Sequence, residues 1–268
     1  MAADNSESNT LSGHVALVTG GSRGIGLSIA CELAAAGAAV AICSRGKPAL
    51  SVAEEVLSSF GVPCLVQPCD IRSPQQVESF VSCVEKELGQ VDILVNNASI
   101  YRTEPVQGHS LEIWNEVLET NVTGAMLLSR RVLSGMIELN WGRIINISSV
   151  SGKVGEIWGS AYSASKFALI GFTQSLSLEV ARNGITVNAV CPGWVDTEMA
   201  KGQLEDPQWC KLNSVDPSES LSNACFSVPQ MRFIEPSEVA ALVVFLASVA
   251  ARGITGQSIN ICGGLSLH

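Results

Sequence analysis

Histidine, tyrosine and closely spaced cysteine are all scarce in this sequence. Its 268 residues contain three His and two Tyr, and the nine Cys include no C-x-x-C pair. Metal motifs need closely spaced Cys or His, so the sequence predicts no metal site. An odd number of thiols, mostly in apolar runs, indicates buried free cysteines in a reducing compartment.

Basic residues are too few to balance the acidic ones, and the net charge is −9. A nucleic-acid binder would show a basic face, and a chain of this charge is not drawn to anionic membranes. The polar, acidic N-terminus carries no signal or transit features. The longest apolar run, Val239–Ala251, is too short to cross a bilayer and is typical of a core helix. We therefore expect a cytoplasmic protein with no nucleic-acid or membrane partner.

What the sequence does have is apolar content and a regular alternation. Hydrophobic residues make up 47%, and a chain of this length buries roughly 75% of its unfolded surface, so its core needs no disulfide or metal. Short apolar runs alternate with helical patterns along the chain. Strands are expected at 14–19, 39–43, 63–67, 91–96, 143–148, 185–190 and 258–262, and helices at 27–36, 47–60, 74–88, 111–139, 161–182 and from 236 onwards.

This alternation predicts the fold class. Strands separated by helices form a parallel sheet with helices on both faces. The sequence shows no internal repeat and no linker, so we expect residues 13–268 to form a single α/β domain. Residues 1–12 are expected to be a flexible N-terminal lead.

A glycine-rich turn joins the first expected strand to the first expected helix. Gly20 and Gly24 are separated by three residues, and Gly24 and Gly26 by one. Bare backbone at such a junction can approach a pyrophosphate, which the N-terminus of the following helix can bind. A glycine-rich turn alone is weak evidence, because an ordinary turn has the same composition.

Tyr162 and Lys166 are the pair around which the rest of the chain is organised. They lie four positions apart in an expected helix and therefore share one face. A fixed ammonium favours the phenolate, so we expect Lys166 to lower the pKa of Tyr162 from its ordinary value near ~10. Taken alone, the pair could also be a surface contact without function.

Together these motifs resemble the short-chain dehydrogenase/reductase family. The resemblance rests on Thr19–Gly26, Asn96–Ser99, Asn121, Ser149, the Tyr162-x-x-x-Lys166 spacing and Pro192–Gly193, and it covers about residues 13–264. It implies a Rossmann-type, doubly wound parallel sheet of about seven strands. It also implies a nicotinamide cofactor and a proton transfer centred on a tyrosine.

The resemblance gives each catalytic residue a role. Tyr162 would exchange a proton with the substrate oxygen, and Lys166 would lower its pKa and hold the nicotinamide ribose. Ser149 would hydrogen-bond the substrate oxygen, with its neighbour Ser148 as the rival. Asn121 would hold a water behind Lys166, and the alternative is a satisfied polar residue of the core.

Charges near the second expected strand favour NADP(H) over NAD(H). An acid at the end of that strand would bind a ribose 2′-hydroxyl and repel a 2′-phosphate. Ser44 and Arg45 stand there instead, and with Arg23 in the glycine loop two guanidinium groups can bracket a phosphate. The expected cofactor-binding residues are Gly20, Ser22, Arg23, Gly24, Ile25, Gly26, Ser44, Arg45, Asp70, Ile71, Asn97, Ala98, Tyr162, Lys166, Pro192, Gly193, Val195 and Thr197. Ser99 replaces the glycine that is commoner in the family.

One stretch, Thr197–Arg232, breaks the alternation and contains three Pro. A loop of that length in a compact domain is usually functional or disordered. Because it follows Thr197, which the resemblance places on the cofactor, we expect a mobile substrate lid at about 198–232. Trp209 and Phe226 are its expected apolar contacts, and a decorated surface loop is the alternative.

The substrate is the least determined part. The segments Arg143–Ser149, Gly184–Asn188 and Cys262–Gly264 look most like those of 3-oxoacyl-thioester reductases and bacterial polyketide ketoreductases. This implies a 3-oxoacyl or related β-keto substrate, carried by an acyl-carrier protein or coenzyme A. The basic residues that often meet a carrier are missing at Glu138–Trp141, although Arg130, Arg131 and Arg182 could compensate.

Two other interpretations stay open. One is a dehydrogenase or reductase of another alcohol or ketone, such as a steroid, a sugar or a terpenoid, and the other is a nucleotide-bound scaffold with little turnover. The Pro-Gly-Gly of many aromatic polyketide ketoreductases is absent after Asn96–Ala98, so the handedness of the product is open.

The patterns at 111–139 and 161–178 resemble the pairing surfaces of family tetramers, so we expect a homotetramer.

Overall fold

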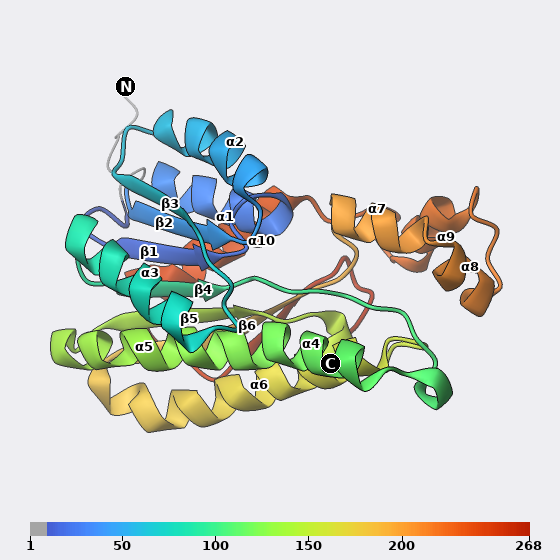
Figure 1. The fold of residues 1–268 in the computed structure, drawn as a ribbon. Helices are drawn as coiled ribbons and strands as arrows, with labels where there is room; N and C mark the ends of the chain where they lie inside the picture. Colours follow the sequence, from blue (N-terminus) through green and yellow to red (C-terminus); the bar gives the residue numbers. More distant parts are fainter. Residues whose placement is uncertain (1–9) are drawn as a thin grey trace, which may run out of the picture.

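The computed structural model describes residues 10–268, and in this range it contains one seven-stranded sheet in the order β3-β2-β1-β4-β5-β6-β7 (Figure 1). All neighbouring strands are parallel. The strands are β1 (Val15–Thr19), β2 (Ala39–Ser44), β3 (Cys64–Pro68), β4 (Ile93–Asn96), β5 (Gly142–Ile147), β6 (Ile185–Pro192) and β7 (Ser258–Ile261). The order runs outward in both directions from β1 and β4, so the predicted doubly wound sheet is confirmed.

Helices cover both faces of the sheet (Figure 1). One face carries α1 (Gly24–Ala35), α2 (Lys47–Ser58) and α10 (Pro236–Ala247), and the other carries α3 (Pro74–Glu87), α5 (Gly124–Leu139) and α6 (Ser160–Val180). Alternate residues of β1 enter different cores, with Ala16 and Val18 on the first face and Val15 and Leu17 on the second. Because both faces are buried, the strands are mainly apolar rather than alternating.

The predicted single helix over 111–139 is interrupted. Its first part is α4 (Leu111–Leu118), a π-helical turn follows at Glu119–Thr123, and α5 begins at Gly124. A π turn adds one residue to a helical turn and is frequent at functional sites. It contains Asn121, a residue type that regular helix interiors disfavour.

The stretch after β6 is not an irregular loop. It contains three short helices, α7 (Glu198–Leu204), α8 (Pro207–Asn213) and α9 (Ser220–Ser227), which project from the body in Figure 1. The Thr197 side chain caps α7 by accepting from the Ala200 N–H, and Asp206 caps α8. Leu204 of α7 and Cys210 of α8 are buried. Helices this short repeat their apolar pattern too few times to be recognised from sequence.

Several hydrogen bonds tie these helices to the body, and two of them involve α8. Trp158 Nε1 donates to the Leu212 carbonyl at 2.9 Å, and Gln208 Nε2 donates to the Thr103 carbonyl at 3.2 Å. Phe226 is 67% exposed, and its role as an apolar contact of the lid, like that of Trp209, stays a prediction.

The end of the predicted flexible N-terminal lead packs on the core. Residues 1–9, which form most of the predicted lead over 1–12, lie outside the described residues. Leu11 is buried in the core, and its N–H donates to the Ala36 carbonyl at 2.9 Å. Across residues 10–268, no helix has the length and apolar character that crossing a bilayer requires.

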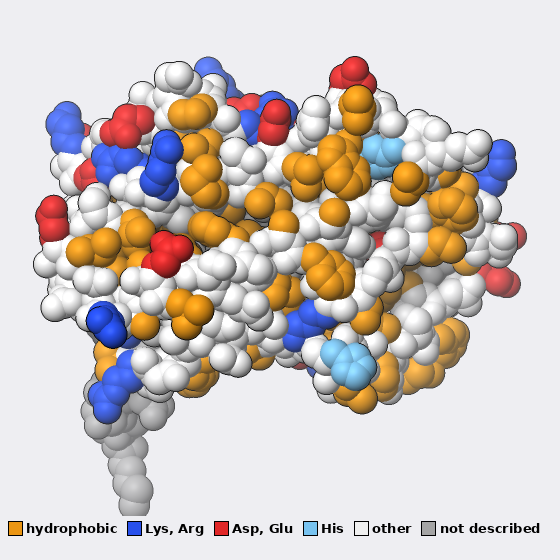
Figure 2. All heavy atoms as spheres, turned by 90° about the horizontal axis from the view of Figure 1, so that it is seen from below, with side chains coloured by type: hydrophobic (Ala, Val, Ile, Leu, Met, Phe, Trp, Pro, Cys, Tyr) orange, Lys and Arg blue, Asp and Glu red, His pale blue; other side chains and the backbone are white. Residues whose placement is uncertain are grey.

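The outer face of α5 and α6 carries exposed apolar side chains. They include Ile137, Leu139, Phe167 and Leu178. Figure 2 views the molecule from this side and shows hydrophobic side chains spread between the charged ones. This surface suits the predicted pairing of subunits, and the homotetramer itself stays a prediction.

Candidate active site

A cavity of about 750 Å³ opens at the carboxyl ends of the strands, where open α/β sheets bind their ligands. All eighteen predicted cofactor residues line it: Gly20, Ser22, Arg23, Gly24, Ile25, Gly26, Ser44, Arg45, Asp70, Ile71, Asn97, Ala98, Tyr162, Lys166, Pro192, Gly193, Val195 and Thr197. Ser149 lines it as well. Of the predicted catalytic residues, Asn121 alone is not in its wall.

Two glycines, one in the loop before α1 and one in its first turn, have no room for a side chain. Gly20 has a φ of 65°, and a Cβ added there would lie 2.9 Å from the Ala98 Cα. A Cβ on Gly26 would overlap the Gly20 carbonyl oxygen and the Asn97 side-chain amide. The loop therefore lies directly on the end of β4, and the N-terminus of α1 stays open to the cavity.

Thr19, which was not among the predicted site residues, holds the floor of the cavity. The N–H groups of Asn97 and Ala98 donate to Thr19 Oγ1, both at 3.0 Å. Asn97 Nδ2 donates to the Thr19 carbonyl at 2.8 Å. The ends of β1 and β4 are therefore fixed to each other beneath the cofactor-binding residues.

The cavity end near β2 fits a phosphorylated ribose. Arg23 and Arg45 line it and have weak partners, Glu198 at 3.1 Å and Glu116 at 3.9 Å respectively. Exposed ion pairs of this kind add little stability, so both guanidinium groups can turn to a phosphate. The Ser44 Oγ is buried and has no hydrogen-bond partner within the described residues. A phosphate oxygen would accept a hydrogen bond from the Ser44 hydroxyl.

Asp70 and Ile71, two of the predicted cofactor-binding residues, lie in the cavity wall. The Asp70 carboxylate accepts a two-pronged hydrogen bond from the Arg72 guanidinium, whose shortest contact is 2.6 Å. This bond holds the pKa of Asp70 below its usual value. The side chain is fixed, so the wall has a defined shape.

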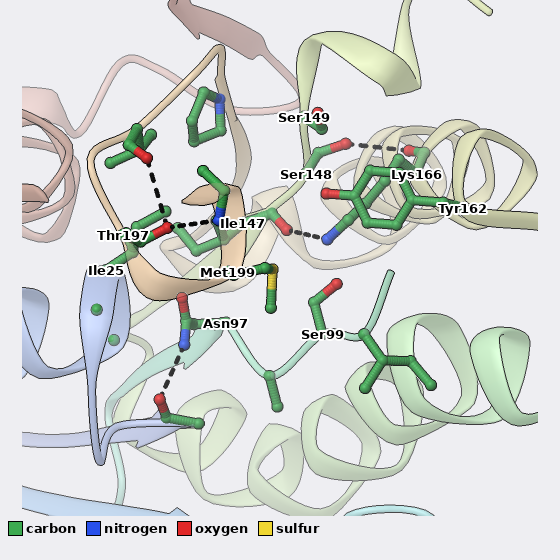
Figure 3. Close-up of a pocket in the computed structure, with 18 of the residues that line it drawn as sticks. Ile25, Asn97, Ser99, Ile147, Ser148, Ser149, Tyr162, Lys166, Thr197 and Met199 are labelled. Carbon is green, nitrogen blue, oxygen red and sulfur yellow. Dashed lines mark hydrogen bonds between the residues drawn. The ribbon is translucent and has the colours of Figure 1, made fainter. Parts of the chain in front are cut away.

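Tyr162 and Lys166 lie one turn apart on α6 and face the cavity (Figure 3). Lys166 is 2% exposed, and its Nζ donates to the Ile147 carbonyl at 2.9 Å. The same nitrogen lies 5.3 Å from the centre of the Tyr162 ring. Burial lowers the pKa of Lys166 to about 8, because the charged form is deprived of water.

The pKa of Tyr162 is shifted in the direction opposite to our prediction. Burial raises it above its ordinary value, and the negative charge of Glu156 raises it further. The hydroxyls of Ser149 and Ser99 oppose this shift by stabilising the phenolate. The Lys166 ammonium, which would stabilise the phenolate, donates a hydrogen bond to the Ile147 carbonyl, and burial lowers its own pKa.

The two adjacent serines have different surroundings. Ser148 Oγ is buried and donates to the Lys166 carbonyl at 3.1 Å. Ser149 Oγ accepts from the Ser151 N–H at 3.1 Å and lies close enough to Tyr162 to influence its pKa. The geometry therefore favours Ser149 over Ser148 as the partner of a substrate oxygen.

The side-chain amide of Asn121 makes three hydrogen bonds. Its Oδ1 accepts from the Ile100 N–H at 2.9 Å, and its Nδ2 donates to the Ile100 carbonyl at 3.0 Å and to Ser165 Oγ at 3.0 Å. The π turn gives this side chain its position. Asn121 thus fixes the segment after β4 against α6, next to Lys166.

The structure also brings into the cavity wall residues that the sequence did not single out. Glu156 and Gln203 line it and hydrogen-bond to each other at 2.9 Å, and Met199 lies opposite Tyr162 and Lys166 (Figure 3). Glu156 lies in an irregular segment and Gln203 in a short helix, so neither belongs to a motif. Nothing in the sequence marks them as neighbours.

Comparison with known proteins gives one consistent result. Residues 14–208 match the model of the short chain dehydrogenase family. A Streptomyces coelicolor protein, named provisionally as a ketoacyl reductase, is 42% identical over 258 residues, which cover 96% of this chain and 98% of that protein. The 3-oxoacyl-acyl-carrier-protein reductase of Vibrio cholerae is 38% identical over 255 residues, covering 95% and 98%.

A solved structure agrees with this. The crystal structure of an actinorhodin polyketide ketoreductase variant with NADPH superposes with a TM-score of 0.92 at 42% identity, covering 95% of this chain and 98% of that one. The chain therefore belongs to the short-chain dehydrogenase family, as its motifs predicted. Membership in this family implies a nicotinamide cofactor, and the cavity is shaped to receive one.

Proposed function

We propose that this protein is an NADPH-dependent reductase of ketones, and that its substrate is a 3-oxoacyl thioester or a related β-keto compound. The observation that carries the proposal is the joint placement of Ser149, Tyr162 and Lys166 in one cavity with two weakly paired arginines. The names of the similar proteins support the reaction and the substrate class.

The side chains support reduction in particular. A nicotinamide bound in the cavity would supply hydride to the ketone carbon. Tyr162 is a phenol that is protonated at neutral pH, and it would donate its proton to the ketone oxygen. Ser149 donates a hydrogen bond to the same oxygen and stabilises the charge that develops on it.

Lys166 and Asn121 would restore the proton. Lys166 has a pKa of about 8, so it can gain or lose a proton near neutral pH. Its Nζ lies beneath the Tyr162 ring, and Asn121 fixes the neighbouring backbone. A water between Lys166 and Asn121, as predicted from the sequence, would complete the route to solvent.

The carrier of the substrate is a further part of the proposal. Arg131 is engaged by Glu78 at 2.9 Å and by Glu85 at 2.8 Å, so it is not available to an acidic carrier protein. Arg130 and Arg182 are exposed. We propose that the substrate is delivered as a coenzyme A thioester or on an acyl-carrier protein. Arg130 and Arg182 would determine which of these two carriers binds.

The test is a panel of ketones assayed with the purified protein. Oxidation of NADPH is followed by absorbance with β-keto esters, β-keto thioesters, steroid ketones, sugars and terpenoid ketones. The proposal expects the highest kcat/KM with the β-keto esters and thioesters. A higher value with a steroid, a sugar or a terpenoid would contradict the substrate class, and no turnover with any ketone would favour a nucleotide-bound scaffold.

A further inference from the structure

Glu156 is hydrogen-bonded to three segments that are far apart in the sequence. Its Oε1 accepts from the Tyr101 hydroxyl at 2.8 Å and from Gln203 Nε2 at 2.9 Å, and its Oε2 accepts from Ser151 Oγ at 2.9 Å. Tyr101 follows β4, Ser151 lies in the 3₁₀ turn Val150–Gly152, and Gln203 belongs to α7. The carboxylate therefore joins the segment after β4 and the turn at Val150–Gly152 to α7 of the predicted lid.

This carboxylate has hydrogen-bond donors but no cation. All three partners donate, which suits an ionised carboxylate because it can only accept. Among residues 10–268, no Lys, Arg or His forms an ion pair with Glu156. Burial raises the pKa of Glu156, and the hydrogen bonds from Tyr101, Ser151 and Gln203 oppose this shift, so the charged form is stabilised in the cavity wall by dipoles alone.

The charge lies at the reacting end of the cavity. Glu156 lines the same cavity as Ser149 and Tyr162. The ring of Tyr101, which holds the carboxylate, packs edge-on against the ring of Tyr162 with 5.0 Å between their centres. A ketone whose oxygen meets Tyr162 and Ser149 therefore has a negative charge beside one of its substituents.

A β-keto compound brings a second carbonyl group close to this charge. In a free β-keto acid, one methylene separates the ketone carbon from the carboxylate, so the anion cannot leave the reacting end. Two like charges in a cavity with little water repel each other strongly. In an ester or a thioester the same position is uncharged, and the repulsion is absent.

We infer that Glu156 is a specificity-determining residue that excludes free β-keto acids and admits their esters and thioesters. The inference rests on the proposed function and narrows its substrate class. It assigns to Glu156 a role in choosing the substrate rather than in the proton transfer.

The test compares two ketones that differ by one charge, 3-oxobutanoate and its ethyl ester. For the wild type we expect kcat/KM for the ester to exceed that for the acid at least tenfold, or about 1.4 kcal/mol. In Glu156→Gln this ratio should fall about tenfold, mainly through a lower KM for the acid. The amide oxygen can keep the bonds from Tyr101 and Gln203, and the amide N–H can donate to Ser151.

The ratio separates charge repulsion from other effects. A change in the pKa of Tyr162 affects both ketones alike, so it cancels. Glu205→Gln is the matched control, because it removes one exposed negative charge at the end of α7 outside the cavity wall. We expect this control to leave the ratio within twofold of the wild type.

The outcomes distinguish the inference from the proposed function. A Glu156→Gln ratio equal to that of the wild type would overturn the inference alone. Wild-type protein that prefers the acid would also overturn it, without the need for any variant to fold. Failure of the wild type to reduce either ketone would count against the proposed function, and the inference would fall with it.

Discussion

The two ends of the cavity are built in different ways. The end predicted to bind the cofactor, the cofactor end, consists of backbone and of residues adjacent in sequence, the loop Gly20–Gly26 and the pair Ser44–Arg45. The end predicted to bind the ketone, the substrate end, consists of long side chains from separate segments, which meet at Glu156. The cofactor end depends on local conformation, whereas the substrate end depends on contacts between distant elements. Substitutions can therefore change the substrate while leaving the cofactor in place, and the predictions below test this separation.

The largest effect is expected where the two ends meet. Tyr162→Phe removes the proton donor and keeps the ring, so kcat/KM for ketone reduction should fall about 1000-fold. The dissociation constant of NADPH, measured by its fluorescence, should change less than threefold. Tyr101→Phe is the matched control, since it removes the same atom from the adjacent ring, and it should cost less than tenfold. A Tyr162→Phe variant with more than a tenth of the wild-type rate would exclude Tyr162 as the proton donor.

The pH dependence of the reverse reaction should be the next largest effect. Alcohol oxidation needs the Tyr162 phenolate, and because its pKa is raised the phenolate fraction grows about tenfold per pH unit. We expect kcat/KM for oxidation with NADP⁺ to rise about 100-fold from pH 6 to 8. Above that, Lys166 loses its charge, since its pKa is about 8, and the rise should flatten. A profile that is already flat at pH 6 would contradict the raised pKa.

At the cofactor end, Arg45→Asp should shift the cofactor preference from NADPH towards NADH. A charge-assisted hydrogen bond to the 2′-phosphate is lost and a repulsion is gained, so the NADPH-to-NADH ratio of kcat/KM should fall about 30-fold. KM for the ketone should stay within twofold. Arg252→Asp, at an exposed position outside the cavity wall, serves as the control. An unchanged ratio would show that Arg45 is not the phosphate ligand.

At the substrate end, the predicted lid should affect the ketone alone. Replacing residues 198–228 with a short Gly/Ser loop removes Met199 and Gln203 from the cavity wall. We expect KM for bulky ketones to rise about tenfold, because the shape of the pocket is lost, while NADPH binding changes less than threefold. An unchanged substrate profile would place specificity in residues 100–106 and 154–158 instead.

The smallest effect on chemistry is expected outside the cavity. Light scattering should show a homotetramer, and Leu178→Arg on the exposed face of α6 should reduce it to dimers, because a charge would be buried in the contact. Activity per subunit should stay within threefold. A wild-type protein that is monomeric at all concentrations would contradict the predicted assembly.

The cofactor end and the Tyr162–Lys166 pair could be predicted from the sequence because their signals are local. Gly20 and Gly26 are separated by a short fixed spacing, and Tyr162 and Lys166 occupy one helical face. Each of these relations needs only the geometry of a single element. The parallel sheet was predictable for a similar reason, since strands and helices alternate without interruption until β6.

The substrate end could not be predicted, because its contacts join residues from different elements. Nothing in the sequence relates Tyr101 to Glu156 or Glu156 to Gln203. The shifted pKa of Tyr162 was missed for the same reason, since burial and Glu156 outweigh the neighbouring lysine. The three helices after β6 are too short to show a period.

The π turn at Glu119–Thr123 makes the length of this part of the chain critical. Deleting one residue there would restore a regular helix but rotate α4 by about 100° relative to α5. Val117 and Trp114, which pack with Ile100 beside the cavity, would then turn out of phase with their partners. We therefore expect insertions and deletions here to disrupt the packing, whereas a substitution would leave the phase of the two helices unchanged. The extra residue sets the angular register of the helices beside the substrate end.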